Sequence, residues 1–211
     1  MKRKMKWLYL ILVITLMALI EKNMSYWPKS IFKVLLFLLL PCFFFQLNNS
    51  YQKIKIAKTA KYLSLAAVLS IILGYFILDH FIDYEPIRIQ LKQMMGISKD
   101  NFFWIALYIS FINAFIEEFF FRGVYYLEEG KQRNTFISAS AFAIYHLAIM
   151  DRWLSLPFLL LATSALLLVG LLFNRLALEN DSIYSSYFLH LVANLTLNTI
   201  AYFFILWNIK F

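Results

Sequence analysis

The chain has 211 residues, of which 62% are hydrophobic and only 15% are charged. A soluble domain carries roughly 45–50% apolar and about 25% charged residues, so the composition argues against a water-soluble globule. The formal net charge is +8, but the Lys and Arg residues lie beside apolar stretches and form no single basic patch, which argues against nucleic acid as a partner. Anionic lipid headgroups are the partner that this distribution favours.

Apolar runs follow one another along the chain and predict an all-α fold, a multi-pass transmembrane helical bundle with about seven spans. Most of the runs approach the roughly 20 helical residues that cross a hydrocarbon core. Helices are expected because the runs lack the alternation of a barrel strand, and a backbone in lipid must satisfy its own hydrogen bonds. The runs at 135–150 and 153–173 could instead form one bent unit. The runs lie near residues 7–20, 31–47, 62–82, 102–127, 135–150, 153–173 and 183–208.

The basic N-terminus predicts how the chain is oriented. Lys2, Arg3, Lys4 and Lys6 precede the first apolar run, and no small-x-small cleavage site follows it. We therefore expect an uncleaved signal anchor in the cell membrane with its N-terminus in the cytoplasm. In that orientation the four Lys residues of 53–61 also face the cytoplasm, as the positive-inside rule requires.

Ionisable groups inside the spans are the informative residues, because each costs about 2.5–3.5 kcal/mol on the insertion scale. A rise of 1.5 Å per residue places four polar residues at depths of roughly 11–17 Å from the cytoplasmic end of their spans. That level is near the middle of a core about 30 Å thick, so three separate spans are expected to bring their polar groups to one cavity. The four residues are Glu117, His146, His190 and Asn194.

Spacing along the first of these spans separates two neighbouring carboxylates. Glu118 and Arg122 are four residues apart and share a helix face, so the guanidinium can neutralise that carboxylate. A purely structural ion pair is the alternative for them. Glu117 is turned about 100° away. It is expected to face apolar surroundings, where a carboxylate beside a like charge is suited to act as a general base.

The two later spans supply imidazole and amide groups. His190 and Asn194 are also four residues apart, so both could donate hydrogen bonds to a water or to a developing oxyanion. Alternatively, such residues are interhelical hydrogen-bonding partners. His146 follows Phe142 by one turn. The single cysteine, Cys42, excludes an intrachain disulfide and a Cys-based zinc site.

Three short motifs occur in order along these spans. They are Glu-Glu-x-x-x-Arg at 117–122, Phe-x-x-x-His at 142–146 and His-x-x-x-Asn at 190–194. Their order and spacing resemble the CPBP family of intramembrane proteases, also called CAAX proteases and bacteriocin-processing or Abi proteins. The resemblance covers about residues 102–208. It implies a catalytic transmembrane core in 102–211 and N-terminal transmembrane helices in 1–101, integrated in one membrane domain.

The resemblance implies a hydrolase, an intramembrane endopeptidase that cleaves a CAAX-like or bacteriocin-type peptide or a lipidated protein in the membrane. In that case Glu117 activates the water with support from His146, and His190 and Asn194 stabilise the oxyanion. Glu118 with Arg122 fixes the helix that carries both residues. The substrate, any need for prenylation and the oligomeric state stay open.

Metal dependence also stays open, because members of this family are often described as metalloproteases. Zn²⁺ held by Glu117, His146 and His190 is one hypothesis, although the spacing is not the His-Glu-x-x-His of zincins. The hypothesis that we favour has no metal cofactor, since one buried carboxylate with two imidazoles and an amide suffices for a base and an oxyanion site.

Three other interpretations compete with this one. The same fold could act without catalysis, as a bacteriocin self-immunity or binding protein. A proton-coupled transporter is less favoured, since the sequence shows no inverted repeat and no matching pair of broken spans. Asp79, His80 and Asp83 form a small cluster at a span end, where solvated polar residues are ordinary, so a metal site there is disfavoured.

Overall fold

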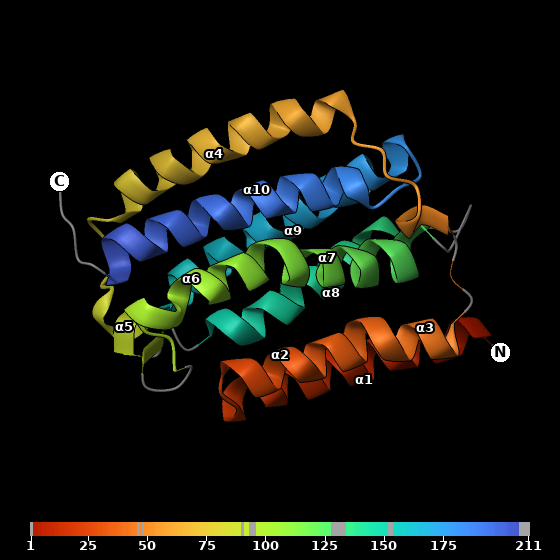
Figure 1. Ribbon diagram of the computed structural model, residues 1–211, viewed down its shortest axis with the longest axis horizontal. Helices are drawn as coiled ribbons and strands as arrows, with labels where there is room; N and C mark the ends of the chain where they lie inside the picture. The colour runs from red at the N-terminus through yellow and green to blue at the C-terminus, as the bar shows by residue number, and fades with distance from the viewer. Residues whose placement is uncertain are drawn as a thin grey trace.

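The computed structural model describes residues 2–45, 47, 49–89, 91–92, 96–127, 134–151 and 154–206. All regular secondary structure in these ranges is helical, which confirms the expected all-α fold. Figure 1 shows that the long helices run side by side along the long axis of the molecule. The predicted start of one run, at residue 153, and the predicted end of the last run, at residue 208, lie outside the described residues.

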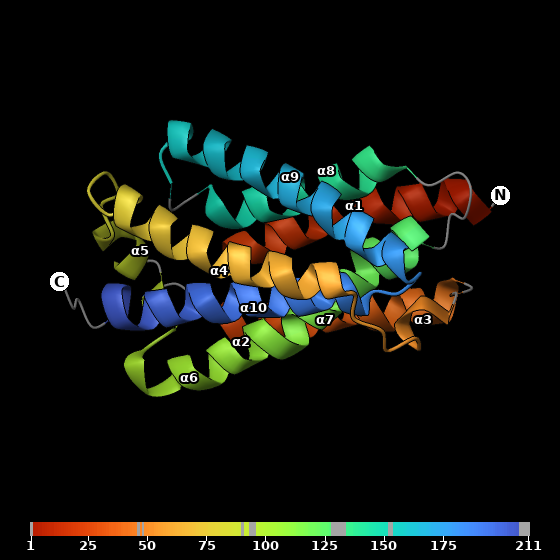
Figure 2. The ribbon, with the colours of Figure 1, turned by 90° about the horizontal axis from the view of Figure 1, so that it is seen from above.

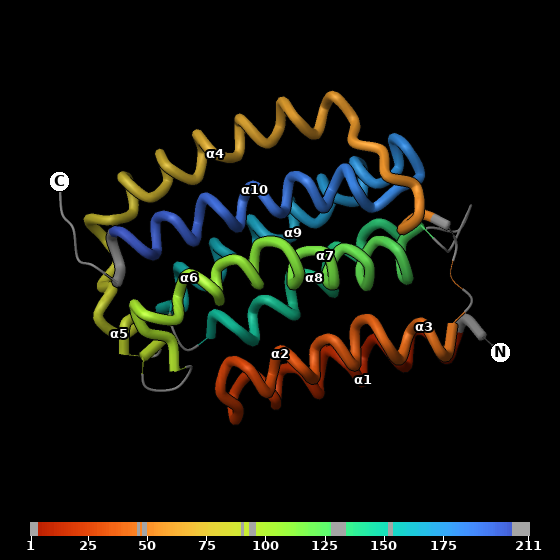
Figure 3. Tube along the Cα trace, viewed as in Figure 1, coloured from red at the N-terminus to blue at the C-terminus, as the bar shows by residue number. Residues whose placement is uncertain are grey.

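The helices are, in chain order, α1 (Lys2–Asn23), α2 (Tyr26–Val34), α3 (Leu40–Phe44), α4 (Lys58–Leu78), α5 (Glu85–Ile89), α6 (Lys99–Leu107), α7 (Ala114–Glu118), α8 (Thr135–Met150), α9 (Leu156–Glu179) and α10 (Tyr184–Ile200). Wider π-helical turns, η1 (Leu35–Leu39), η4 (Tyr108–Asn113), η5 (Phe119–Leu127) and η7 (Ala201–Leu206), continue some of these helices, and η2 (Asn49–Tyr51) is a short 3₁₀ turn. In the tube of Figure 3, the chain from α6 through α7 runs on as one long helix.

Four of these helical stretches are long and apolar enough to cross a membrane. They are Tyr26–Phe44, Lys58–Leu78, Lys99–Leu127 and Leu156–Glu179, and α8 is a shorter apolar helix. With these spans the chain is a multi-pass membrane protein. The count of about seven spans and the orientation of the N-terminus stay predictions.

Packing brings distant parts of the sequence together in pairs. Helices α1 and α2 lie along one edge of the molecule and α4 lies against α10 on the other, as Figure 1 shows. Helices α8 and α9 pack along each other, seen from above in Figure 2. The alternative of one bent unit over 135–173 is therefore wrong, because the chain reverses between Met150 and Leu156 and the two helices form a hairpin.

Small residues allow the close approach of α8 and α9. A Cβ placed on Gly170 would lie 3.1 Å from both the Cα and the Cβ of Ala139. Glycine and alanine at such a crossing let two backbones come near, which is how helices commonly associate in lipid.

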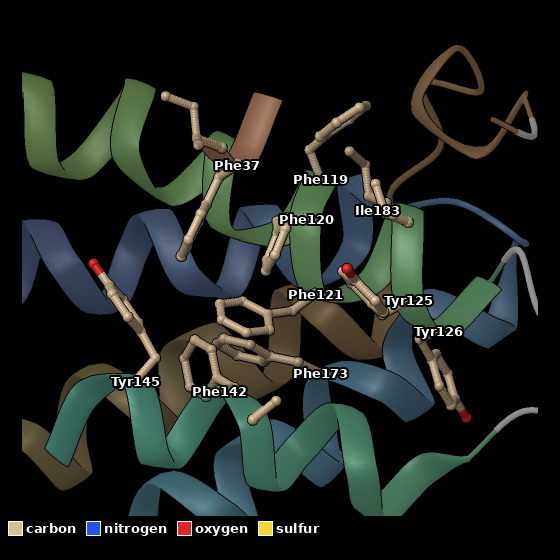
Figure 4. Packing of buried hydrophobic residues seen from close by; sticks show 14 of the residues in the cluster. Phe37, Phe119, Phe120, Phe121, Tyr125, Tyr126, Phe142, Tyr145, Phe173 and Ile183 are labelled. Atoms are coloured by element: carbon tan, nitrogen blue, oxygen red, sulfur yellow. The ribbon is translucent and has the colours of Figure 1, made fainter. Parts of the chain in front are cut away.

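Aromatic rings fill the centre of the bundle. Figure 4 shows the ring of Phe142 on α8 directed toward Phe121 on η5, while the ring of Tyr145 rises from α8 on the side of Phe37. Phe37 stacks on Phe120 with ring centroids 4.1 Å apart, and Phe121 meets Phe142 edge to face at 5.5 Å. Such contacts add to the free energy gained from burial.

Apolar side chains also cover the outside of the bundle. On α4, Leu65, Leu69 and Leu73 are 62%, 61% and 61% exposed. A water-soluble protein rarely exposes a continuous apolar face, so this surface fits a hydrocarbon environment. Most of the polar residues described next lie on other helices and are buried inside the bundle.

Candidate active site

Both carboxylates of the first motif lie on the long helix Lys99–Leu127, in its short segment α7. The helix begins with a capping box, in which the side chains of Ser98 and Asn101 bond each other's backbone. Segments η4 and η5 flank α7 on either side, so the hydrogen-bond register changes twice around the two glutamates. Widened turns of this kind occur often at functional sites.

The two oxygens of Glu117 have different surroundings. Oε1 accepts hydrogen bonds from Lys33 Nζ at 3.1 Å and from Asn113 Nδ2 at 2.9 Å. Oε2 is buried and has no hydrogen-bond partner among the described residues. It lies 3.6 Å from His146 Nε2 and 3.8 Å from His190 Nε2, distances that are too long for a direct hydrogen bond.

Each imidazole is held through its other nitrogen. Nδ1 of His146 lies 2.9 Å from the carbonyl oxygen of Phe142, and Nδ1 of His190 lies 2.9 Å from Oε1 of Glu118. Because a carbonyl and a carboxylate only accept, both Nδ1 atoms carry the hydrogen, and in the neutral rings both Nε2 lone pairs face Glu117. The expectation that these three residues meet in one place therefore agrees with the geometry.

Glu118 and Arg122 form the ion pair that their spacing predicts. Nη1 of Arg122 donates to Oε1 of Glu118 at 3.0 Å, and both side chains are fully buried. Nη2 donates to the carbonyl of Gly170 at 3.3 Å. The guanidinium carbon lies 4.5 Å from the ring centre of Phe142 and 4.9 Å from that of Phe173, so aromatic faces also stabilise the cation.

Asn194 makes an interhelical hydrogen bond. Its Nδ2 donates to the carbonyl of Ile109 at 3.2 Å, and Asn198 one turn later donates to Ser110 Oγ at 3.1 Å. Both acceptors lie in η4, where the widened turns change the regular backbone bonding. This is the packing role that the sequence left open beside the oxyanion role.

Residues 99–196 match the family model described as type II CAAX prenyl endopeptidase, Rce1-like. They form an Rce1-like domain. The resemblance to the CPBP or CAAX proteases is thereby confirmed, and the match includes all seven residues of the three motifs. No curated protein and no solved structure matches the chain. An endopeptidase that works in the membrane is the activity that the Rce1-like domain supports.

Two residues of the site were missed by the sequence analysis, and one of them lies outside the Rce1-like domain. Lys33 on α2 and Asn113 on η4 both contact Glu117, so the expectation that this carboxylate faces apolar surroundings is wrong. A signal was present in the sequence. Polar residues recur at helical spacing along one face of an otherwise apolar span, and that face is buried in the structure. The residues on this face are Tyr26, Lys29, Ser30 and Lys33.

The donor set around Glu117 is only partly suited to a metal. One carboxylate oxygen and two imidazole nitrogens are ligands that Zn²⁺ accepts. However, the Lys33 ammonium already binds the same carboxylate, and its positive charge opposes a cation there. Among the described residues no group of His, Cys, Asp and Glu side chains has the arrangement of a metal site, and this includes Asp79, His80 and Asp83. The site therefore does not fit zinc well, and no step below uses one.

Proposed function

We propose that the chain is an intramembrane endopeptidase in which Glu117 activates a water molecule for attack on a peptide bond. The observation that carries this proposal is the unpartnered, buried Oε2 of Glu117, which faces the Nε2 atoms of two histidines. A buried carboxylate oxygen without a hydrogen bond is costly, so it is expected where a substrate or water uses it. The endopeptidase family of residues 99–196 supports the same reaction class.

The proposed reaction begins at the unpartnered oxygen of Glu117. Oε2 of Glu117 takes a proton from the water, and the water oxygen bonds to the carbonyl carbon while the carbonyl oxygen becomes an oxyanion. When the intermediate collapses, the C–N bond breaks and the proton passes from Glu117 to the leaving amine. General base catalysis of this type contributes about 10²–10⁴-fold.

The two histidines are proposed to have different roles because their partners differ. His146 donates to a neutral carbonyl, so its Nε2 is suited to accept a hydrogen bond from the water. His190 donates from Nδ1 to a carboxylate, as the histidine of the serine protease triad does, and this contact fixes its ring with Nε2 toward Glu117. A charged His190 can donate from Nε2 to the oxyanion. Asn194, one turn away, is proposed to assist through its second amide hydrogen.

The substrate class is proposed from the family alone. A membrane-associated peptide or a lipidated protein with a CAAX-like end is the substrate that we expect, and a bacteriocin-type peptide is the other. The alternative, a non-catalytic immunity or binding protein, requires none of the site chemistry.

The decisive experiment is a cleavage screen with the purified full chain in detergent. Prenylated CAAX peptides, their unprenylated counterparts and bacteriocin-type peptides are incubated with wild type and with Glu117→Gln, and products are identified by mass spectrometry. We expect cleavage by wild type and a loss of about 10³-fold in the variant. Equal cleavage by both proteins, or full cellular protection by Glu117→Gln in an immunity assay, would overturn the proposal.

A further inference from the structure

We propose that Lys33, on a helix outside the Rce1-like domain, is a positioning residue for the base Glu117. This inference rests on the proposed function. It assigns a role to the N-terminal helices, because α2 lies in residues 1–101 and the family match begins at residue 99. The endopeptidase site is then completed by two parts of the chain rather than by the matched domain alone.

The contacts of Lys33 determine which oxygen of Glu117 is free. Lys33 Nζ lies 3.1 Å from Oε1 of Glu117 and 2.7 Å from Oδ1 of Asn113, and Asn113 Nδ2 lies 2.9 Å from the same Oε1. The three groups form a closed triangle of hydrogen bonds. Because Oε1 is occupied from two directions, Oε2 is the oxygen that remains for a water between the histidines.

Lys33 itself is held on further sides, so it is a fixed support and not a mobile surface lysine. Its side chain is 9% exposed, and Nζ lies 4.8 Å from the ring centre of Tyr145. Tyr145 precedes His146 on α8, and its ring packs edge to face against Phe37 on η1. The same packing therefore sets the relative position of α2, α8 and Glu117.

With the histidines neutral, the charges of these buried, described groups balance only when Lys33 is counted. Glu118 is paired with Arg122, and Lys29 is paired with Glu21 at 2.6 Å on the α1–α2 hairpin. Without Lys33, and with the histidines neutral, the carboxylate of Glu117 would have no cationic partner among the described residues. A buried charge that loses its partner is strongly unfavourable, so the lysine keeps the carboxylate both charged and in place.

Lys29 provides a matched control. It lies one turn before Lys33 on the same buried face of α2 and also forms a buried ion pair, but its partner is Glu21 and not Glu117. Replacing either lysine by Met removes one buried charge from one helix face. Only Lys33→Met removes the support of the base.

The first experiment measures kcat and KM of the purified full chain for a peptide that wild type cleaves. We expect Lys33→Met to lower kcat at least 100-fold with KM within about threefold, because the base is misplaced while the substrate contacts remain. Lys33→Arg, which retains the charge, should have a kcat at least tenfold higher than that of Lys33→Met. Lys29→Met should keep kcat within about threefold, although its thermal stability falls. Equal kcat for Lys33→Met and wild type would overturn the role of Lys33 and leave the proposed function intact.

The second experiment does not depend on cleavage. Thermal unfolding in detergent is compared for Lys33→Met, Glu117→Gln and the double variant. A direct contact predicts that the two decreases in Tm do not add, and that the double variant is more stable than their sum indicates. Additive decreases would overturn the contact itself. If wild type cleaves no peptide while Lys33 and Glu117 are coupled in this cycle, the proposed function fails, and with it the catalytic role of Lys33.

Discussion

Nδ1 of His190 lies 2.9 Å from Oε1 of Glu118, and this oxygen also accepts a hydrogen bond from Arg122 at 3.0 Å. One carboxylate thus orients an imidazole and neutralises a guanidinium. It fixes the ring of His190 so that Nε2 is directed toward Glu117. The second glutamate of the motif therefore connects the structural ion pair to the proposed oxyanion donor.

Glu118→Gln should destabilise the protein strongly. The change keeps the shape of the side chain but leaves the fully buried Arg122 without its counter-ion, and removing one partner of a buried pair costs about 3–5 kcal/mol. Thermal unfolding in detergent measures the effect. The pair of the exposed Glu85 and the partly buried Arg88 supplies the control, because Glu85→Gln should change stability by less than about 0.5 kcal/mol. A similar small change for both variants would contradict the structural importance of the buried pair.

Replacing either active-site histidine should stop most of the cleavage. His146→Gln and His190→Gln are each expected to lower kcat by about 10²–10⁴-fold, because each removes a ring that faces Glu117 Oε2. His80, which is exposed, is the matched control, and His80→Gln should leave kcat unchanged. Steady-state kinetics on one cleaved peptide tests all three variants. Retained activity in either active-site variant would remove that residue from the mechanism.

Asn194→Ala should separate an oxyanion role from a packing role. Loss of one interhelical hydrogen bond costs about 0.6 kcal/mol on average in a membrane protein, and Asn198→Ala also loses interhelical bonds to the same helix, to Ser110 Oγ and to the carbonyl of Ala106. We therefore expect similar decreases in Tm for the two variants. If Asn194 also stabilises the oxyanion, only its variant should lower kcat, by about 10²–10³-fold. Equal kcat for the two variants would leave Asn194 a packing residue.

Gly170→Val should separate α8 from α9. The added Cβ would meet Ala139 at 3.1 Å, and overpacking of this kind costs about 1–3 kcal/mol. The shift should also disturb Arg122, which donates to the carbonyl of Gly170, so cleavage is expected to fall with the Tm. Gly74→Val on α4 is the control, because its Cβ would meet no atom within 4 Å. Equal stability of the two variants would show that the helices can move apart freely.

Cleavage should persist in the presence of a metal chelator. The ammonium of Lys33 on the Glu117 carboxylate opposes a divalent cation at the same group. The rate is measured before and after dialysis against chelator, and the metal content of the active protein is determined by elemental analysis. Loss of activity in chelator that Zn²⁺ restores would show that the metal-free mechanism is wrong.

The sequence alone was sufficient to predict the helices and several of the groups that meet at the site. Apolar runs of membrane length, the cost of charge in lipid, and spacings of four residues are local properties, so they can be read without coordinates. They predicted the Glu118–Arg122 pair and the meeting of Glu117 with His146 and His190. The catalytic roles of these residues stay proposals.

The tertiary structure decided which oxygen of Glu117 is free and what holds the other one. Lys33 is 84 residues away from Glu117 in the sequence, and no local rule joins a lysine on one span to a carboxylate on another. The hairpin of α8 and α9 was likewise not determined by the apolar runs, because the close approach at Gly170 depends on two helices that each look ordinary alone. Side-chain periodicity fixes the face on which a residue lies, but only the packing of helices decides which residue it meets.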